Sequence, residues 1–110
     1  MKGGIFMEIL ATYKHNMGGV FKLAKVSDDF FMYGTQKEFD SLFGVSVDRC
    51  GTREEVLSHC LRISELCSEH IEKYKKLKEK DNKIGWDLLI TDNQSEKNML
   101  LYFAEVLRTI

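Results

Sequence analysis

The stretch TREEVLSHCLRISELCSEHIEKYKKLKEK, residues 52–80, decides the fold of this chain. Apolar residues recur along it at steps of three and four, the spacing of one face of an α-helix. Thr52 and Glu55 have the spacing of a capping box, in which the threonine hydroxyl accepts the Glu55 amide proton and the carboxylate reaches back. The stretch therefore predicts a long amphipathic helix, with an apolar face made of Val56, Leu57, Cys60, Leu61, Ile63, Cys67, Ile71, Tyr74 and Leu77.

The length of this helix does not fit a domain of the chain's size. A helix over residues 52–80 would be about 43 Å long, at about 1.5 Å per residue. A compact domain of 110 residues has a diameter of only about 34 Å. Three outcomes can resolve the mismatch: the lysine-rich end at residues 73–83 frays, the helix breaks near it, or a second chain packs alongside. We expect homodimerisation through the two C-terminal helices.

The residues before this helix predict an antiparallel meander. Residues 6–13 show the period of two that is typical of a half-buried strand, and the residues on one side are Met7, Ile9, Ala11 and Tyr13. Residues 15–19 are of types that favour a turn, and residues 20–26 carry the β-branched and aromatic side chains that favour a second strand. Residues 30–33 complete the meander, and we expect residues 45–47 as a fourth strand.

A second capping box predicts a short helix after the meander. Thr35 and Glu38 repeat the spacing of Thr52 and Glu55, and both segments read Gly-Thr-x-x-Glu. We interpret the repeat as two helix starts with the same capping chemistry. A duplicated functional motif would give the same sequence pattern. The helix, at about residues 36–43, would bury Phe39, Leu42 and Phe43, and Gly44 would end it in the left-handed conformation.

The last third of the chain predicts a final helix. Residues 85–91 alternate loosely and could return as a fifth strand, after which Asp92, Asn93 or Ser95 could cap the helix. Its apolar face would comprise Met99, Leu100, Phe103, Val106, Leu107 and Ile110. The predicted fold class is therefore α+β, with an antiparallel sheet of three to five strands and one short helix, then the long amphipathic helix and the C-terminal helix. We expect a single domain over residues 1–110, mainly β over 1–50 and mainly helical over 52–110.

Composition and charge narrow the classes of partner. Sixteen Lys and Arg against 17 Asp and Glu give a net charge of -1, without the positive field that drives most nucleic-acid binding. No apolar run reaches the roughly 18 residues of a membrane span. The three cysteines lie within 18 positions and do not resemble a secreted disulfide framework, and no secretory segment precedes Glu8. We expect reduced thiols, a cytoplasmic location, and neither nucleic acid nor a membrane as partner.

Cys50 is the candidate reactive thiol. It lies just before the long helix and next to Arg49, and a helix N-terminus and a guanidinium both lower a thiol pKa. A nucleophile also needs a base, and His59 and His70 lie further along the same helix without a spacing that points back toward Cys50. We therefore favour the interpretation that Cys50 is a half-buried small residue, with the reactive thiol as the alternative. We expect no catalytic residues, no metal and no cofactor.

The sequence favours a non-enzymatic binding protein that acts by occupying another protein. Small chains of this kind include many regulators and inhibitors, among them phage or mobile-element proteins that block a host defence enzyme, and this expectation rests on the size class alone. The alternative is a small-ligand or nucleotide-binding protein with a pocket between the sheet and the long helix, lined by Tyr13, Phe31, Tyr33 and Tyr74. The candidate contact residues are Tyr13, Tyr33, Tyr74, Lys75, Lys76 and Trp86, although core packing would also explain the aromatic ones.

Overall fold

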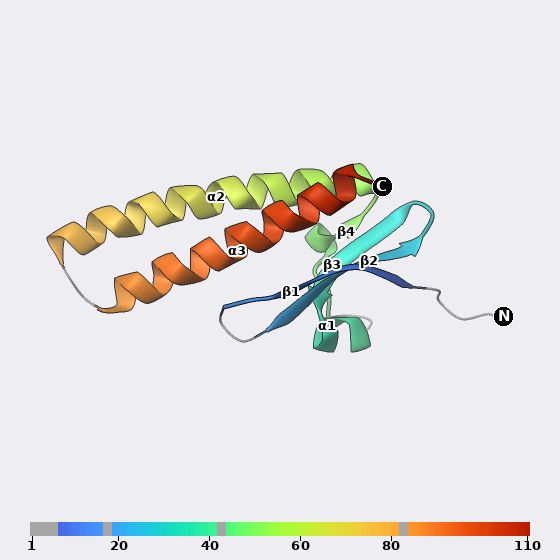
Figure 1. Ribbon diagram of the computed structural model, residues 1–110, viewed down its shortest axis with the longest axis horizontal. Coiled ribbons are helices and arrows are strands. Elements are labelled where there is room, and N and C mark those ends of the chain that lie inside the picture. The colour runs from blue at the N-terminus through green and yellow to red at the C-terminus, as the bar shows by residue number, and fades with distance from the viewer. Residues whose placement is uncertain (1–6, 17–18, 42–43, 82–83) are drawn as a thin grey trace.

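The chain forms an antiparallel sheet followed by two long helices, which confirms the predicted α+β class (Figure 1). The computed structural model describes residues 7–16, 19–41, 44–81 and 84–110. In chain order the elements are β1 (Glu8–Lys14), β2 (Val20–Ser27), β3 (Phe30–Thr35), α1 (Gln36–Asp40), the 3-10 helix η1 (Val47–Arg49), β4 (Cys50–Gly51), α2 (Arg53–Lys80) and α3 (Ile84–Arg108).

The sheet has the order β1-β2-β3-β4, so the predicted meander is confirmed. The strand pairing shifts between Ile9 and Ala11, because Ile9 lies opposite Ala24 and Ala11 lies opposite Leu23. This bulge reverses the alternation of side chains around Leu10. Ala11 is therefore buried while Ile9 is 46% exposed, and the expectation that both lie on one face is wrong.

Two local expectations between β3 and α2 are wrong. Residues 45–47 do not form the fourth strand, since Val47 begins η1 and the short β4, which pairs with β3, begins three residues later at Cys50. The capping box of α1 is confirmed, but this helix ends at Asp40 and buries none of its residues. The C-cap of α1 is Ser41, so Gly44 does not end this helix. Leu42 and Phe43 lie outside the described residues.

α2 has the predicted start and the predicted length. The Thr52 hydroxyl accepts the Glu55 amide proton at 3.2 Å, and the Thr52 amide donates to the Glu55 carboxylate at 2.9 Å. The helix continues without a break to Lys80. Of the three outcomes considered for its excess length, fraying and breaking therefore do not occur up to this residue.

α3 replaces the strand expected at residues 85–91. It begins at Ile84 and runs for 25 residues, so Asp92, Asn93 and Ser95 lie inside the helix and do not cap it. α3 lies antiparallel to α2 along most of its length, and the two helices form a hairpin (Figure 1). The molecule is correspondingly elongated, with principal extents of 59 × 25 × 20 Å.

The core lies where one half of this hairpin meets the sheet. Buried sheet residues contact both helices, and the cluster comprises Ala11, Leu23, Phe31, Tyr33, Val56, Cys60, Cys67, Met99, Leu100, Phe103, Ala104 and Leu107. The other half of the hairpin projects beyond the sheet, whereas α1 lies on the side of the sheet away from the helices (Figure 1). No helix in the described ranges has the length and hydropathy to cross a membrane.

Two glycine substitutions should change stability in opposite directions. Gly51 has φ +148°, and a Cβ there would lie 2.7 Å from the capping carboxylate of Glu55. Gly51→Ala should therefore lower the free energy of unfolding by more than about 1 kcal/mol. At Gly85, in the first turn of α3, a Cβ would meet no atom within 4 Å, so Gly85→Ala should raise stability by up to about 1 kcal/mol. Urea denaturation measures both, and equal destabilisation by the two variants would contradict this account of Gly51.

Candidate functional site

The predicted contact residues do not form one site. Tyr13 and Lys75 line a pocket beside α3, and Tyr33 lines a separate cleft between the sheet and α2. Tyr74 and Trp86 stack on each other in the projecting half of the hairpin, with ring centroids 6.0 Å apart. Lys76 lies on the exposed side of α2. The molecule therefore has three separate candidate surfaces.

The first surface is the side of the projecting hairpin that continues the sheet-facing rows of the two helices, which we call the distal face: His70, Tyr74, Leu77, Leu88 and Leu89. Trp86 lies two residues before Leu88, about 200° away around α3, and it stacks on Tyr74 of α2. On α2, His59 and Ile63 face the sheet, and His70, Tyr74 and Leu77 continue their row at steps of seven, four and three residues. The His70 and Tyr74 rings lie 6.2 Å apart. The row of α2 side chains that faces the sheet therefore extends past the end of the sheet.

The same continuation occurs on α3. Met99 and Phe103 are fully buried in the core. Leu88 and Leu89 precede them by eleven and fourteen residues, which is close to three and four helical turns and places them on the same side of the helix. Because the sheet does not reach this far, Leu88 is 59% exposed and Leu89 is 40% exposed. Sequence reasoning missed both leucines because it expected a strand at residues 85–91.

The surroundings of the distal face are cationic. Residues 73–80 of α2 contain five lysines and one glutamate. Lys78 pairs with Asp87 of α3 at 2.5 Å, and Lys75 lies 3.6 Å from Glu72. The Trp86 indole nitrogen is buried and has no hydrogen-bond partner in the described part of the chain. The projecting end thus combines exposed apolar side chains with a positively charged margin.

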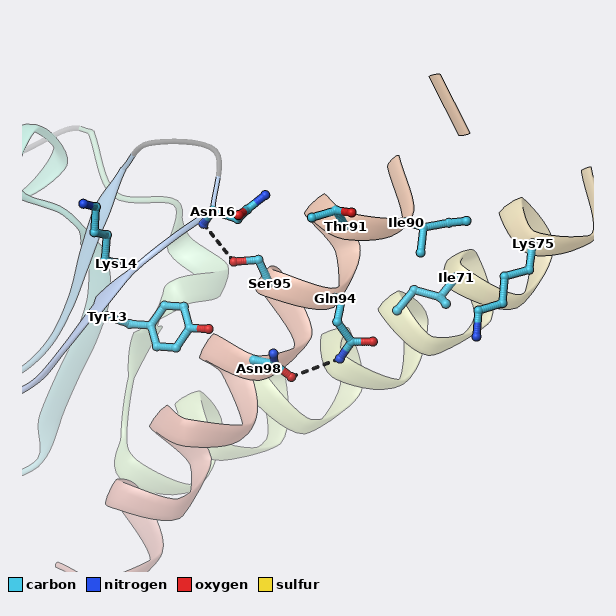
Figure 2. A pocket seen from close by; sticks show the side chains of 10 residues that line it. All are labelled: Tyr13, Lys14, Asn16, Ile71, Lys75, Ile90, Thr91, Gln94, Ser95 and Asn98. Carbon is cyan, nitrogen blue, oxygen red and sulfur yellow. Dashed lines mark hydrogen bonds between the residues drawn. The ribbon is translucent and has the colours of Figure 1, made fainter. Parts of the chain in front are cut away.

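The second surface is a shallow pocket of about 570 Å³ between the end of β1, α3 and α2. Figure 2 shows Tyr13, Lys14 and Asn16 on one side of α3 and Ile71 and Lys75 beyond it. The main-chain N–H of Asn16 donates to the Ser95 hydroxyl at 2.9 Å. The Gln94 amide donates to Asn98 at 3.0 Å, so the polar groups on this helix surface are partly paired with one another.

His15 joins this end of the sheet to α3, a contact that no sequence pattern indicated. The imidazole is buried, and its Nε2 lies 3.0 Å from Glu96 Oε1. Its Nδ1 lies 3.9 Å from Asp92, and its ring packs beside Phe21 with centroids 5.7 Å apart. These contacts hold the β1–β2 connection against the helix.

The third surface is a cleft of about 330 Å³ between the sheet and α2, which we call the sheet–helix cleft. It is lined by Phe21, Tyr33, Ser46, Asp48, Arg49, His59, Ile63 and Glu96. Burial, reinforced by Cys60 and Glu96, raises the pKa of the Tyr33 hydroxyl, so it stays protonated. Burial and the charge of Arg62 lower the pKa of His59, so its imidazole is neutral at pH 7.

An ion pair fixes one wall of this cleft. Arg49 donates to both carboxylate oxygens of Glu38, at 3.0 Å and 2.7 Å. Its guanidinium lies 5.8 Å from the centre of the Tyr33 ring. Burial alone would raise the pKa of Glu38, but hydrogen bonds from Arg49 and Thr35 and the charge of Arg49 outweigh it and lower the pKa. The short helix α1 is thereby joined to η1.

The structure places Cys50 nearer to a histidine than its sequence spacing indicated. Cys50 and His59 line one open pocket of about 510 Å³ with Arg62. The Cys50 thiol points to backbone carbonyls, with its Sγ 3.5 Å from the oxygen of Val47 and 3.8 Å from that of Ser46. In both contacts the S–H is the donor and the carbonyl oxygen accepts. Within the described ranges, no group of three or more His, Cys, Asp and Glu is placed to hold a metal ion.

Comparison with known proteins does not identify a relative. No family model, no curated protein and no solved structure matches the chain.

Alkylation should separate the three thiols. Cys60 and Cys67 are buried, and burial together with Glu96 raises the pKa of Cys60 to about 12 and also raises that of Cys67. Neither forms much thiolate at pH 8, whereas Cys50 is partly exposed. Native protein treated with iodoacetamide at pH 8 should carry the label on Cys50, located by peptide mass spectrometry. Equally fast labelling of Cys60 or Cys67 would contradict the burial seen in the structure.

Replacement of Glu38 should change the acid dependence of stability. Its pKa in the folded protein lies below the ordinary value of 4.5, so the carboxylate stabilises the fold above that pH and the contribution is lost as the pH falls through the folded pKa. Glu38→Gln should cost about 1 kcal/mol at pH 7, and the difference from wild type should shrink at acid pH. Glu105→Gln, at an exposed position 3.8 Å from Arg108, should change little and serves as control. A pH-independent difference would exclude the ion pair as its cause.

Proposed function

We propose that the chain is a non-enzymatic protein-binding module, a small regulator or inhibitor that acts by occupying another protein. The observation that supports the proposal most directly is the distal face, where a row of side chains built to pack against the sheet continues beyond the sheet. Contiguous exposed apolar side chains on a monomer commonly mark a binding surface. The proposed target surface is apolar at its centre, to accept Leu88 and Leu89, with acidic groups around it.

The shape of the molecule suits this role. The projecting half of the hairpin offers two antiparallel helices that α2–α3 packing already holds in place. A partner would therefore bind a preformed surface and would not have to order it, which lowers the entropic cost of association. Tyr74, which stacks on Trp86, gives the surface a rigid aromatic group of the kind that often dominates binding energy.

We propose as target a host defence enzyme, which a phage or mobile-element protein would block. Identification of the protein that the chain captures tests this proposal. We also propose a cytoplasmic location, because all three cysteines are unpaired and unpaired, buried cysteines suit a reducing compartment.

Homodimerisation through the two C-terminal helices belongs to the same proposal. The apolar face of α2 is largely covered by α3 of the same chain. A second copy would therefore pack on the distal face and cover Leu88 and Leu89 until a target displaces it.

Charge substitutions on the distal face should abolish partner capture. The variant with Leu88→Glu and Leu89→Glu places carboxylates where apolar contact is proposed, so immobilised protein should recover at least about tenfold less partner from cell lysate than wild type. Leu101→Glu is the matched control, because Leu101 lies on the same helix and is 41% exposed. Quantitative mass spectrometry measures the capture. Equal loss in the control, or full capture by the double variant, would overturn the proposed surface.

The same variants test self-association. Sedimentation equilibrium at high micromolar concentration should give a dimer for wild type and for Leu101→Glu, and a monomer for the double variant. A wild-type monomer would refute the homodimer and leave the target-binding proposal to the capture experiment. Thermal melting of each variant by circular dichroism establishes that the fold is retained.

A further inference from the structure

The sheet–helix cleft contains a hydroxyl without a hydrogen-bond partner among the described residues. Tyr33 is only 2% exposed and lines the cleft. Its ring packs against Phe103 with centroids 5.7 Å apart and against His59 with centroids 6.0 Å apart. Among the described residues, the fully buried side-chain atom without a partner is the Trp86 indole nitrogen, so the Tyr33 hydroxyl is not completely enclosed. It can donate to a molecule that enters the cleft.

His59 presents a second donor. Its Nδ1 lies 3.2 Å from the guanidinium of Arg62, which can only donate, so Nδ1 is the acceptor. Because the neutral imidazole carries one proton, that proton resides on Nε2. The Tyr33 hydroxyl and the His59 Nε2–H are therefore two donors on groups that line one cleft.

The charges that line the cleft exclude an anion and favour a ligand with N–H groups. Asp48 and Glu96 contribute two carboxylates. Arg49 is the cation among these lining residues, and it donates hydrogen bonds to both carboxylate oxygens of Glu38. A phosphate would be repelled by the two lining carboxylates. An amino group could donate to Asp48, or to the Glu96 oxygen that His15 does not contact.

The walls and volume indicate a small planar ring. Phe21 and His59, which are both half-buried, provide aromatic surface, on which heterocycles stack. A volume of about 330 Å³ lies at the lower end of the range for ligand sites, so a single base or nucleoside fits better than a larger cofactor.

From these observations we infer that the sheet–helix cleft binds an uncharged nucleobase or nucleoside that carries an amino group. The ring lies against the aromatic wall, its acceptor atoms receive the protons of Tyr33 and His59, and its amino group donates to Asp48 or Glu96. This site is separate from the distal face, and it can exist whether or not the protein-binding proposal is correct.

The test is a titration of the whole chain with defined probes. Adenosine, guanosine, cytidine, uridine and adenosine monophosphate are each titrated by calorimetry up to millimolar concentration. At least one of the three amino-bearing nucleosides should bind, and uridine and the monophosphate should bind at least about tenfold more weakly than it does. Absence of binding by all three amino-bearing nucleosides, or equal binding of uridine or the monophosphate, would overturn the inference.

Two substitutions locate the site. Tyr33→Phe keeps the ring and removes the hydroxyl, and it should weaken binding roughly tenfold. Asp48→Asn, at an exposed position that core packing does not constrain, should weaken it if its carboxylate receives the amino group, and Glu96→Gln tests the other carboxylate. Tyr13→Phe is the matched control, because Tyr13 lines the pocket of Figure 2 and should leave affinity unchanged. Loss in Tyr13→Phe with normal affinity in Tyr33→Phe would assign the ligand to that pocket and refute the cleft.

Discussion

The antiparallel packing of α2 on α3 is the contact on which the rest of the structure depends. It buries residues such as Cys67 and Leu100 between the helices and gives the domain a rod about which the sheet is built. Because α3 runs beside α2 for most of its length, a helix longer than an ordinary domain of this size needs no second chain to cover it. The sheet then packs on one half of the rod only, and the remaining half projects beyond it (Figure 1).

This mismatch in length generates the distal face. A β-strand rises about 3.3 Å per residue, so the strands and a helix of 28 residues cover very different distances. Where the sheet is present, residues such as Met99 are buried, and where it is absent, Leu88 on the same side of the helix is exposed. The sheet–helix cleft arises differently, where residues of β2, β3, η1, α2 and α3 meet beside Tyr33.

Sequence patterns located only part of these surfaces. Tyr74 and Trp86 were identified as contact residues, and they do meet in the projecting hairpin. Leu88 and Leu89 were missed, although a helical reading of residues 84–91 would have placed them in the row that contains Phe103. Glu96 had no distinguishing neighbour in the sequence, because it meets His15 only through a contact between residues 81 positions apart.

The sequence by itself determined the local structure: the capping boxes at Thr35 and Thr52, the long amphipathic helix and the meander. These features depend on residues a few positions apart, so periodicity and side-chain hydrogen bonding are sufficient to define them. Only the tertiary structure decided that residues 84–91 are helical, since a short apolar run suits a strand or a helix until a partner is present, and here α2 is that partner. It also decided the bulge at Leu10 and the meeting of Tyr33 with His59, because both arise from contacts between distant segments.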